Sequence, residues 1–246
     1  MKKVGQSYKI LCLIPARGGS KRIPKKNIVP LLGRPMIEYV FNAVKKSKLV
    51  NRIILTTDDE EIARIGRKNG IEIPFKRPQS LATNKTPTLP VLKHALKFLK
   101  EKENYWPDFI LLVTPDSPLI QTDQIDRALK LLIRRKVDSV ETVIEVPTVF
   151  HPYNERYIDK KGFTHFLMPK ERAKHSIESG KRPKIYAFGN LFAFKPENLF
   201  KTNTVQGKSS ISIIIDRETA WDVNDPFDLF IAECLMRKRK KNKAKK

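Results

Sequence analysis

Short apolar runs alternate with longer amphipathic segments along most of this chain. Runs such as LCLI and FILLV are continuously apolar, which is typical of strands buried on both faces. Between them, apolar residues recur every three or four positions, which predicts helices with one buried face. Strands are expected at 8–15, 52–57, 71–75, 109–115, 139–146, 184–194 and 210–216, and helices at 35–47, 59–69, 87–102, 122–136 and from 226 onward.

This alternation predicts an α/β fold with a mainly parallel sheet covered by helices on both faces. In such sheets, ligands bind outside the carboxyl ends of the strands. Two segments, 16–27 and 114–120, directly follow predicted strands. We therefore expect them to form the functional site together.

The alternation stops after Pro147. Residues 150–184 are rich in His, Lys and Arg, and YIDKKGFTHFL within them predicts a hairpin with Gly162 in its turn. No internal repeat and no Pro/Gly/Ser-rich linker accompanies this change. We interpret 1–246 as a single domain that carries an inserted arm at about 147–184.

The chain is strongly basic, with 49 Lys and Arg against 26 Asp and Glu and a formal net charge of +23. Such a charge favours anionic partners, which include nucleotides, nucleic acids and anionic membranes. Eight of the last ten residues, 237–246, are Lys or Arg. We interpret them as a disordered, solubilising tail, because no aromatic residue is interleaved for base stacking. A charge-driven nucleic-acid-binding protein is the weaker alternative.

Membrane insertion is not expected, because no apolar run approaches the roughly 18 residues that a spanning helix needs. The first ten residues lack the apolar region of a signal peptide. The two cysteines, Cys12 and Cys234, lie in apolar segments, which favours reduced core thiols and a cytoplasmic protein.

The strongest chemical signal is the loop IPARGGSKRIPKKN at 14–27. Gly18 and Gly19 allow backbone amides to approach an anion. Positive charge that can face several phosphates comes from Arg17, Lys21, Arg22, Lys25 and Lys26. The loop is neither a P-loop nor a GxGxxG motif. Charge alone would also suit a solvated loop, but paired glycines at the end of a strand favour a polyphosphate site.

Several motifs together resemble one family. IPARGGSK, IPKKN, GRPMI, TTDDEEIA, PFKRPQSLA and DVNDPFDLFIAE are similar to the acylneuraminate cytidylyltransferases, the synthetases of CMP-sialic, CMP-legionaminic, CMP-pseudaminic and CMP-Kdo sugars. The resemblance implies a three-layer α/β/α, Rossmann-like fold of the glycosyltransferase-A type. It also implies transfer of CMP from CTP to the anomeric hydroxyl of an acidic sugar for cell-surface polysaccharide biosynthesis. The products are a CMP-sugar and pyrophosphate, and the arm implies a homodimer.

The resemblance also implies site residues, among which Arg17, Lys21 and Lys26 are the catalytic ones. The family's nucleotide positions fall on Ala16, Arg17, Gly18, Gly19, Ser20, Lys21, Lys26, Asn27, Arg77, Thr86 and Thr88. The Mg²⁺ cofactor is expected at Asp222, Asn224 and Asp116, and the sugar acceptor at Thr114 and Arg172.

Four positions depart from the family pattern. TPDSPLI at 114–120 replaces a usual QPTSPLR, which changes Thr114, Asp116 and Ile120, and Asn224 replaces a usual Asp. Asp116 could restore the charge lost at Asn224, although an Asp that caps a turn between two prolines is common. The acceptor therefore stays open between a nonulosonic acid and a Kdo-like or non-acidic sugar.

Overall fold

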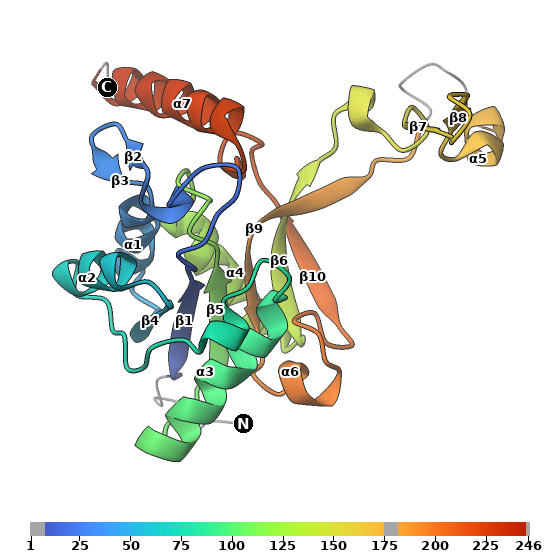
Figure 1. The fold of residues 1–246 in the computed structure, drawn as a ribbon. Coiled ribbons are helices and arrows are strands. Elements are labelled where there is room, and N and C mark those ends of the chain that lie inside the picture. The colour runs from blue at the N-terminus through green and yellow to red at the C-terminus, as the bar shows by residue number, and fades with distance from the viewer. Residues whose placement is uncertain (1–7, 175–181, 245–246) are drawn as a thin grey trace.

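Six strands form the central sheet, in the order β10-β6-β9-β5-β1-β4 (Figure 1). The computed structural model describes residues 8–174 and 182–244. β1 pairs in parallel with β4 and β5, and β6 with β10, while β9 runs antiparallel to both β5 and β6. The sheet strands are β1 (Ile10–Pro15), β4 (Arg52–Thr56), β5 (Phe109–Val113), β6 (Ser139–Glu145), β9 (Tyr186–Phe194) and β10 (Ser210–Ile214).

Helices cover both faces of this sheet. The longer ones are α1 (Ile37–Lys45), α2 (Glu60–Lys68), α3 (Thr88–Glu103), α4 (Thr122–Arg135) and α7 (Pro226–Ala244), and α6 (Asn198–Lys201) is a single turn. Three 3₁₀ turns are η1 (Lys26–Ile28), η2 (Gln79–Leu81) and η3 (Thr148–Phe150), and a short hairpin joins β2 (Pro30–Leu31) to β3 (Arg34–Pro35).

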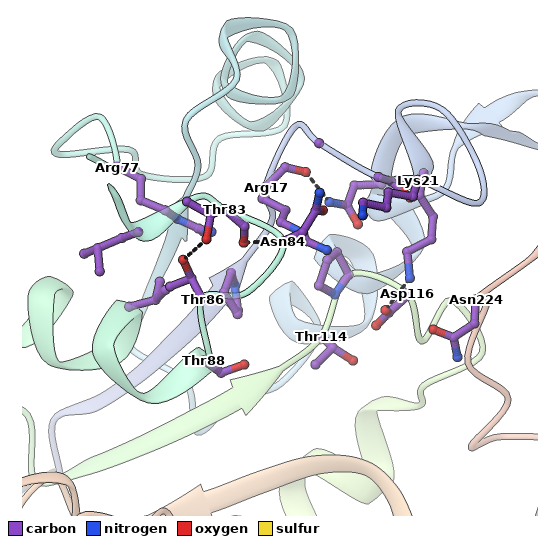
Figure 2. A pocket seen from close by; sticks show the side chains of 18 of the residues that line it. Arg17, Lys21, Arg77, Thr83, Asn84, Thr86, Thr88, Thr114, Asp116 and Asn224 are labelled. Atoms are coloured by element: carbon purple, nitrogen blue, oxygen red, sulfur yellow. Dashed lines mark hydrogen bonds and ion pairs between the residues drawn. The ribbon is translucent and has the colours of Figure 1, made fainter. Parts of the chain in front are cut away.

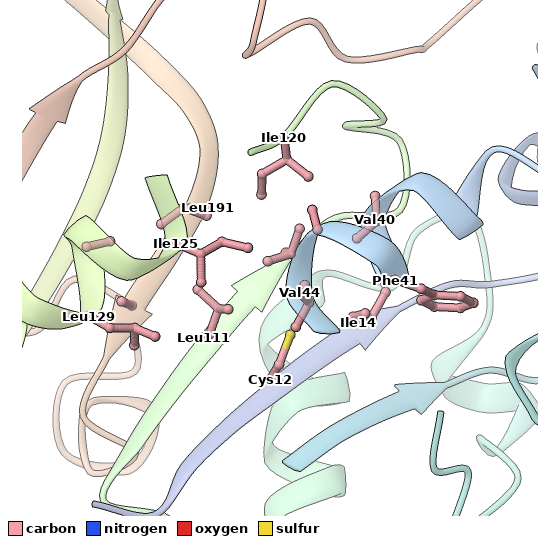
Figure 3. Close-up of a cluster of buried hydrophobic side chains, with 14 of the residues drawn as sticks. Cys12, Ile14, Val40, Phe41, Val44, Leu111, Ile120, Ile125, Leu129 and Leu191 are labelled. Carbon is pink, nitrogen blue, oxygen red and sulfur yellow. The ribbon is translucent and has the colours of Figure 1, made fainter. Parts of the chain in front are cut away.

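The side chains of β1 alternate between two buried cores, because successive residues of a strand point to opposite faces. Cys12 and Ile14 belong to the core that α1 and α4 cover, where Phe41 and Leu129 also lie (Figure 3). Leu11 and Leu13 belong to the core that α3 and α6 cover. The predicted mainly parallel α/β sheet with three layers is therefore confirmed.

The predicted helix ends are confirmed at α2. Asp59 caps the helix by accepting a hydrogen bond from the Ile62 backbone N–H at 2.9 Å, and Gly70 follows the helix with a φ of +69°. The prediction of a strand at 71–75 was wrong. Only an isolated bridge between Ile54 and Glu72 forms there, because Pro74 has no N–H to donate to a ladder.

The arm lies between β6 and β9 and stands away from the sheet in Figure 1. It contains β7 (Arg156–Ile158), β8 (Thr164–Phe166) and α5 (Pro169–Lys174). β7 and β8 form the predicted antiparallel hairpin, and Gly162 in its turn has a φ of +87°. Residues 175–181 of the expected arm lie outside the described part.

The prediction of a disordered tail at 237–246 was wrong for residues 237–244, because α7 continues through Ala244. Three of its basic residues have partners. Arg237 pairs with Glu233 one turn earlier, and Lys238 pairs with Glu218 at 2.7 Å. Arg239 donates to the Leu119 carbonyl oxygen at 3.0 Å. Residues 245–246 lie outside the described part.

Both cysteines are free, but only Cys12 is buried as expected. Cys234 is exposed on α7, so its prediction as a core thiol was wrong. Within the described residues, no helix is both long and apolar enough to cross a bilayer.

Candidate active site

A cavity of about 550 Å³ opens at the carboxyl ends of β1 and β5. The chain leaves β1 for β4 on one side and later returns to β5 on the other, so the two strands flank a topological switch point. Four segments line the cavity, namely the loop after β1, the segment between Arg77 and Val91, the loop after β5, and the segment before α7. This is the place where the sequence predicts the site.

Most of the predicted site residues line this one cavity (Figure 2). They are Arg17, Gly19, Ser20, Lys21, Lys26, Asn27, Arg77, Thr86, Thr88, Thr114, Asp116 and Asn224. Four predicted residues do not line it: Ala16, Gly18, Asp222 and Arg172. Ala16 is fully buried in the core, so it shapes the loop from behind.

The shape of the basic loop depends on contacts at its base. The Gly18 backbone N–H donates to Asp58 Oδ1 at 3.0 Å. A Cβ at Gly18 would lie 2.6 Å from Asp59 Oδ2, whereas a Cβ at Gly19 would meet nothing within 4 Å. Gly18 therefore serves close packing, and Gly19 faces the cavity. At the other end of the loop, Asn27 Nδ2 donates to the Arg17 carbonyl oxygen at 2.8 Å.

Two arginines, Arg17 and Arg77, form another wall of the cavity. Arg77 is almost fully buried, and it donates to the backbone carbonyl and the hydroxyl of Thr56. Burial lowers the pKa of Arg77 to about 10, a change that Asp58 opposes and the positive charge of Arg17 increases. Arg17 Nη1 donates to the Thr83 carbonyl oxygen at 2.8 Å. The two cations are thus fixed by the protein before any ligand binds.

Acidic and amide groups lie at another part of the cavity, where Figure 2 shows Asp116 beside Asn224. Lys26 Nζ donates to Asp116 Oδ2 at 2.7 Å and to the Val223 carbonyl oxygen at 2.8 Å. Lys25, which has a φ of +50°, turns the chain immediately before Lys26. The two oxygen-bearing side chains come from the loop after β5 and the segment before α7.

Asp222 is not among the residues that line the cavity, and its place among the metal ligands stays a prediction. Its carboxylate accepts a hydrogen bond from the Ser117 hydroxyl, and the hydroxyls of Ser117 and Thr114 lie 3.1 Å apart. Burial raises the pKa of Asp222 to about 7, and the negative charge of Asp116 adds to this rise. The hydrogen bond from Ser117 therefore links Asp222 to the loop after β5.

Arg172 lies on the arm and does not line the cavity of its own chain, and its role as an acceptor residue stays a prediction. Its guanidinium stacks 4.2 Å from the centre of the Phe166 ring and donates to the Tyr153 carbonyl oxygen at 2.9 Å. These contacts hold it within the arm.

Comparison with known proteins agrees with this geometry. A family model described as cytidylyltransferase matches residues 11–161, which include both strands that flank the cavity. The chain belongs to the cytidylyltransferase family.

Two named relatives of this cytidylyltransferase come from Campylobacter species. Post-translational flagellin modification protein B of Campylobacter coli is 33% identical over 94% of this chain and 96% of its own length. The CMP-N,N'-diacetyllegionaminic acid synthase of Campylobacter jejuni is 31% identical over 92% of this chain and 94% of its own length. The structure of CMP:2-keto-3-deoxy-manno-octonic acid synthetase complexed with CTP has the same fold, with a TM-score of 0.66 at 15% identity over 94% and 99% of the two chains.

Sequence reasoning missed several cavity residues of the cytidylyltransferase, among them Leu81, Thr83 and Asn84. Thr83 and Asn84 precede α3, a stretch whose only signal is a cluster of polar residues between two predicted elements. The hydroxyls of Thr83 and Thr86 lie 2.7 Å apart, which stabilises this turn against the cavity.

Proposed function

We propose that this chain transfers the cytidylyl group of CTP to the anomeric hydroxyl of a nonulosonic acid. The observation that carries the proposal is the division of one cavity into a basic wall, with Arg17, Lys21 and Arg77, and a part with Asp116 and Asn224. Such a division suits a nucleoside triphosphate on one side and the reacting centre on the other. The activity for which the Campylobacter jejuni relative is named, synthesis of CMP-N,N'-diacetyllegionaminic acid, supports CTP and a nonulosonic acid as substrates.

In this proposal, the phosphates of CTP are bound mainly by residues of the basic loop. Arg17 and Lys21 bind and orient the phosphates, and the Ser20 and Gly19 backbone offers amides to the same oxygens. The anomeric oxygen attacks the α-phosphorus and forms the new P–O bond. The bond from the α-phosphorus to the bridging oxygen breaks, pyrophosphate leaves, and the hydroxyl proton passes to solvent.

Mg²⁺ is the cofactor we propose, and the donor set suits it only in part. Asp116 and Asn224 present oxygen ligands to the cavity, which is the chemistry that Mg²⁺ prefers. Within the described residues, however, no group of three or more acidic, His or Cys side chains could hold a metal ion. The remaining ligands would be phosphate oxygens and water, and the ion would neutralise charge on the leaving group.

A homodimer formed through the arm is also part of the proposal. Ile158 is 72% exposed, Phe163 64% and Leu167 57%, which is unusual for large apolar side chains so close together in sequence. A second copy that covers them would remove this surface from water. Two free cysteines are compatible with a reducing compartment, so we place the reaction in the cytoplasm.

The proposal is tested by pyrophosphate release from four nucleoside triphosphates, each offered with legionaminic, pseudaminic, sialic and Kdo acids. We expect release with CTP and one of the first three acids, and its loss in Lys21→Met. Release of pyrophosphate with Kdo alone would show that the acceptor is a Kdo-like sugar and not a nonulosonic acid. Release with another nucleotide in place of CTP would overturn the proposed donor.

A further inference from the structure

The ammonium group of Lys26 joins three segments that are far apart in the sequence. Its Nζ lies 2.7 Å from Asp116 Oδ2 and 2.8 Å from the Val223 carbonyl oxygen. Lys26 begins η1, Asp116 follows β5, and Val223 precedes α7. The side chains of Lys26 and Asp116 are only 15% and 23% exposed, so solvent screens this ion pair less than a surface pair.

This arrangement places a positive charge among oxygen atoms that would also suit a divalent cation. Asp116 offers a carboxylate, Val223 a carbonyl, and the neighbouring Asn224 lines the same cavity. Hard divalent cations bind carboxylate, carbonyl and amide oxygens. A cation that bound Asp116 would compete with Lys26 for the same carboxylate, and the two positive charges would repel each other.

We propose that Lys26 is an exchangeable cation that keeps a divalent metal ion off Asp116 until a nucleotide binds. This inference rests on the proposed function. A triphosphate in the cavity offers Lys26 a second anionic partner, so that the ammonium can leave Asp116 to the incoming metal ion. Nucleotide and metal binding are then coupled, and each raises the affinity for the other. Lys26 thereby acts as a positioning residue for the metal site as well as a phosphate ligand.

The test measures Mn²⁺ binding to the nucleotide-free protein, from the electron paramagnetic resonance signal of free Mn²⁺. Lys26→Met should bind one Mn²⁺ at least about tenfold more tightly than the wild type, because Asp116 loses its ion-pair partner. Adding Asp116→Asn to Lys26→Met should abolish the gain. Lys21→Met is the matched control, because it removes a lysine of the same cavity that is not the ion-pair partner of Asp116.

Two results would overturn the inference: no gain in Lys26→Met, or an equal gain in Lys21→Met, which would indicate a general charge effect. If Lys26→Met does not fold by circular dichroism, Lys26→Gln replaces it. A further test needs no Lys26 variant, because it compares the wild type with Asp116→Asn alone. The weak Mn²⁺ binding of the wild type should be unchanged in Asp116→Asn. A wild type that binds Mn²⁺ tightly through Asp116 would contradict the exchange. No nucleotide, sugar or turnover enters these measurements, so their outcome is separate from that of the proposed function.

Discussion

Arg17 donates through Nη1 to the carbonyl oxygen of Thr83 at 2.8 Å, and this contact joins the loop after β1 to the turn before α3. The two segments are 66 residues apart in the sequence and line the same cavity. The guanidinium is therefore held in place before any phosphate arrives. Such preorganisation matters because a donor that is already oriented needs no rearrangement during the reaction.

Replacement of Arg17 should weaken catalysis through both charge and geometry. We expect Arg17→Met to lower kcat/KM for CTP by about 10²-fold, a typical loss for one oriented donor. Arg17→Lys should recover only part of this loss, because an ammonium lacks the planar fork of guanidinium. Steady-state kinetics at saturating acceptor measure the effect, and Arg64→Met on the exposed face of α2 is the control. Equal effects at both sites would contradict this role.

The two glycines of the basic loop should respond differently to the same substitution. Gly18→Ala would place a Cβ 2.7 Å from Asp59 Cβ and disturb the cap of α2, so we expect a loss of about 1–3 kcal/mol in unfolding free energy. Gly19→Ala meets nothing within 4 Å and should keep wild-type stability. Urea unfolding compares the two variants, and equal stabilities would show that the contact with Asp59 does not constrain the loop.

The Mg²⁺ requirement should follow the charge at two cavity residues. Asp116→Asn should raise the Mg²⁺ concentration that gives half-maximal turnover by about tenfold or more, because it removes the carboxylate that the proposed metal site presents to the cavity. Asn224→Asp should lower that concentration, because it adds a carboxylate beside Asp116. Turnover measured against Mg²⁺ tests both, with the exposed Asp123→Asn as control. An unchanged Mg²⁺ dependence in Asp116→Asn would remove this residue from the metal site.

Asp222 should make the folded protein less stable as the pH rises. Its pKa is raised from 3.8 to about 7 by burial, so the folded state holds a proton that the unfolded state has lost. This contribution is complete below the unfolded pKa and is lost as the pH passes through about 7. At pH 8, Asp222→Asn should therefore be more stable than the wild type by about 2–4 kcal/mol. Urea unfolding at pH 5 to 8 measures this, and a difference independent of pH would contradict the assignment.

The arm should determine the oligomeric state. Ile158→Glu introduces a charge into the exposed apolar surface of the arm and should shift a dimer toward monomer. Ile214→Glu, at an exposed position of β10 outside the arm, is the matched control. Sedimentation velocity over a range of concentrations gives the answer. Dissociation of the dimer by Ile214→Glu alone would place the interface at β10, an edge strand of the sheet.

The sequence predicts the sheet, its covering helices and the hairpin because their signals are local. Continuous apolar runs identify β1 and β5, and their carboxyl ends locate the basic loop and Asp116. The strand expected at 71–75 failed because Pro74 outweighs its apolar neighbours. The helix at 237–244 was missed because its ion pairs use Glu218 and Glu233, which a count of basic residues does not reveal.

Side-chain direction decides which of the predicted site residues line the cavity. Asp222 and Asn224 are two residues apart, but Asn224 lines the cavity while Asp222 accepts a hydrogen bond from Ser117 behind it. Similarly, the paired glycines have different surroundings, with Gly18 packed against Asp59 and Gly19 open. Both distinctions depend on contacts with residues that are 40 to 105 positions away in the sequence. Spacing within a motif cannot supply them.

The most direct test of the central claim is mass spectrometry of the product formed from CTP and a nonulosonic acid. We expect one CMP-sugar for each pyrophosphate released, with turnover that Lys21→Met largely removes. Absence of a CMP-sugar with every nonulosonic acid tested, while the protein is folded and binds CTP, would contradict it.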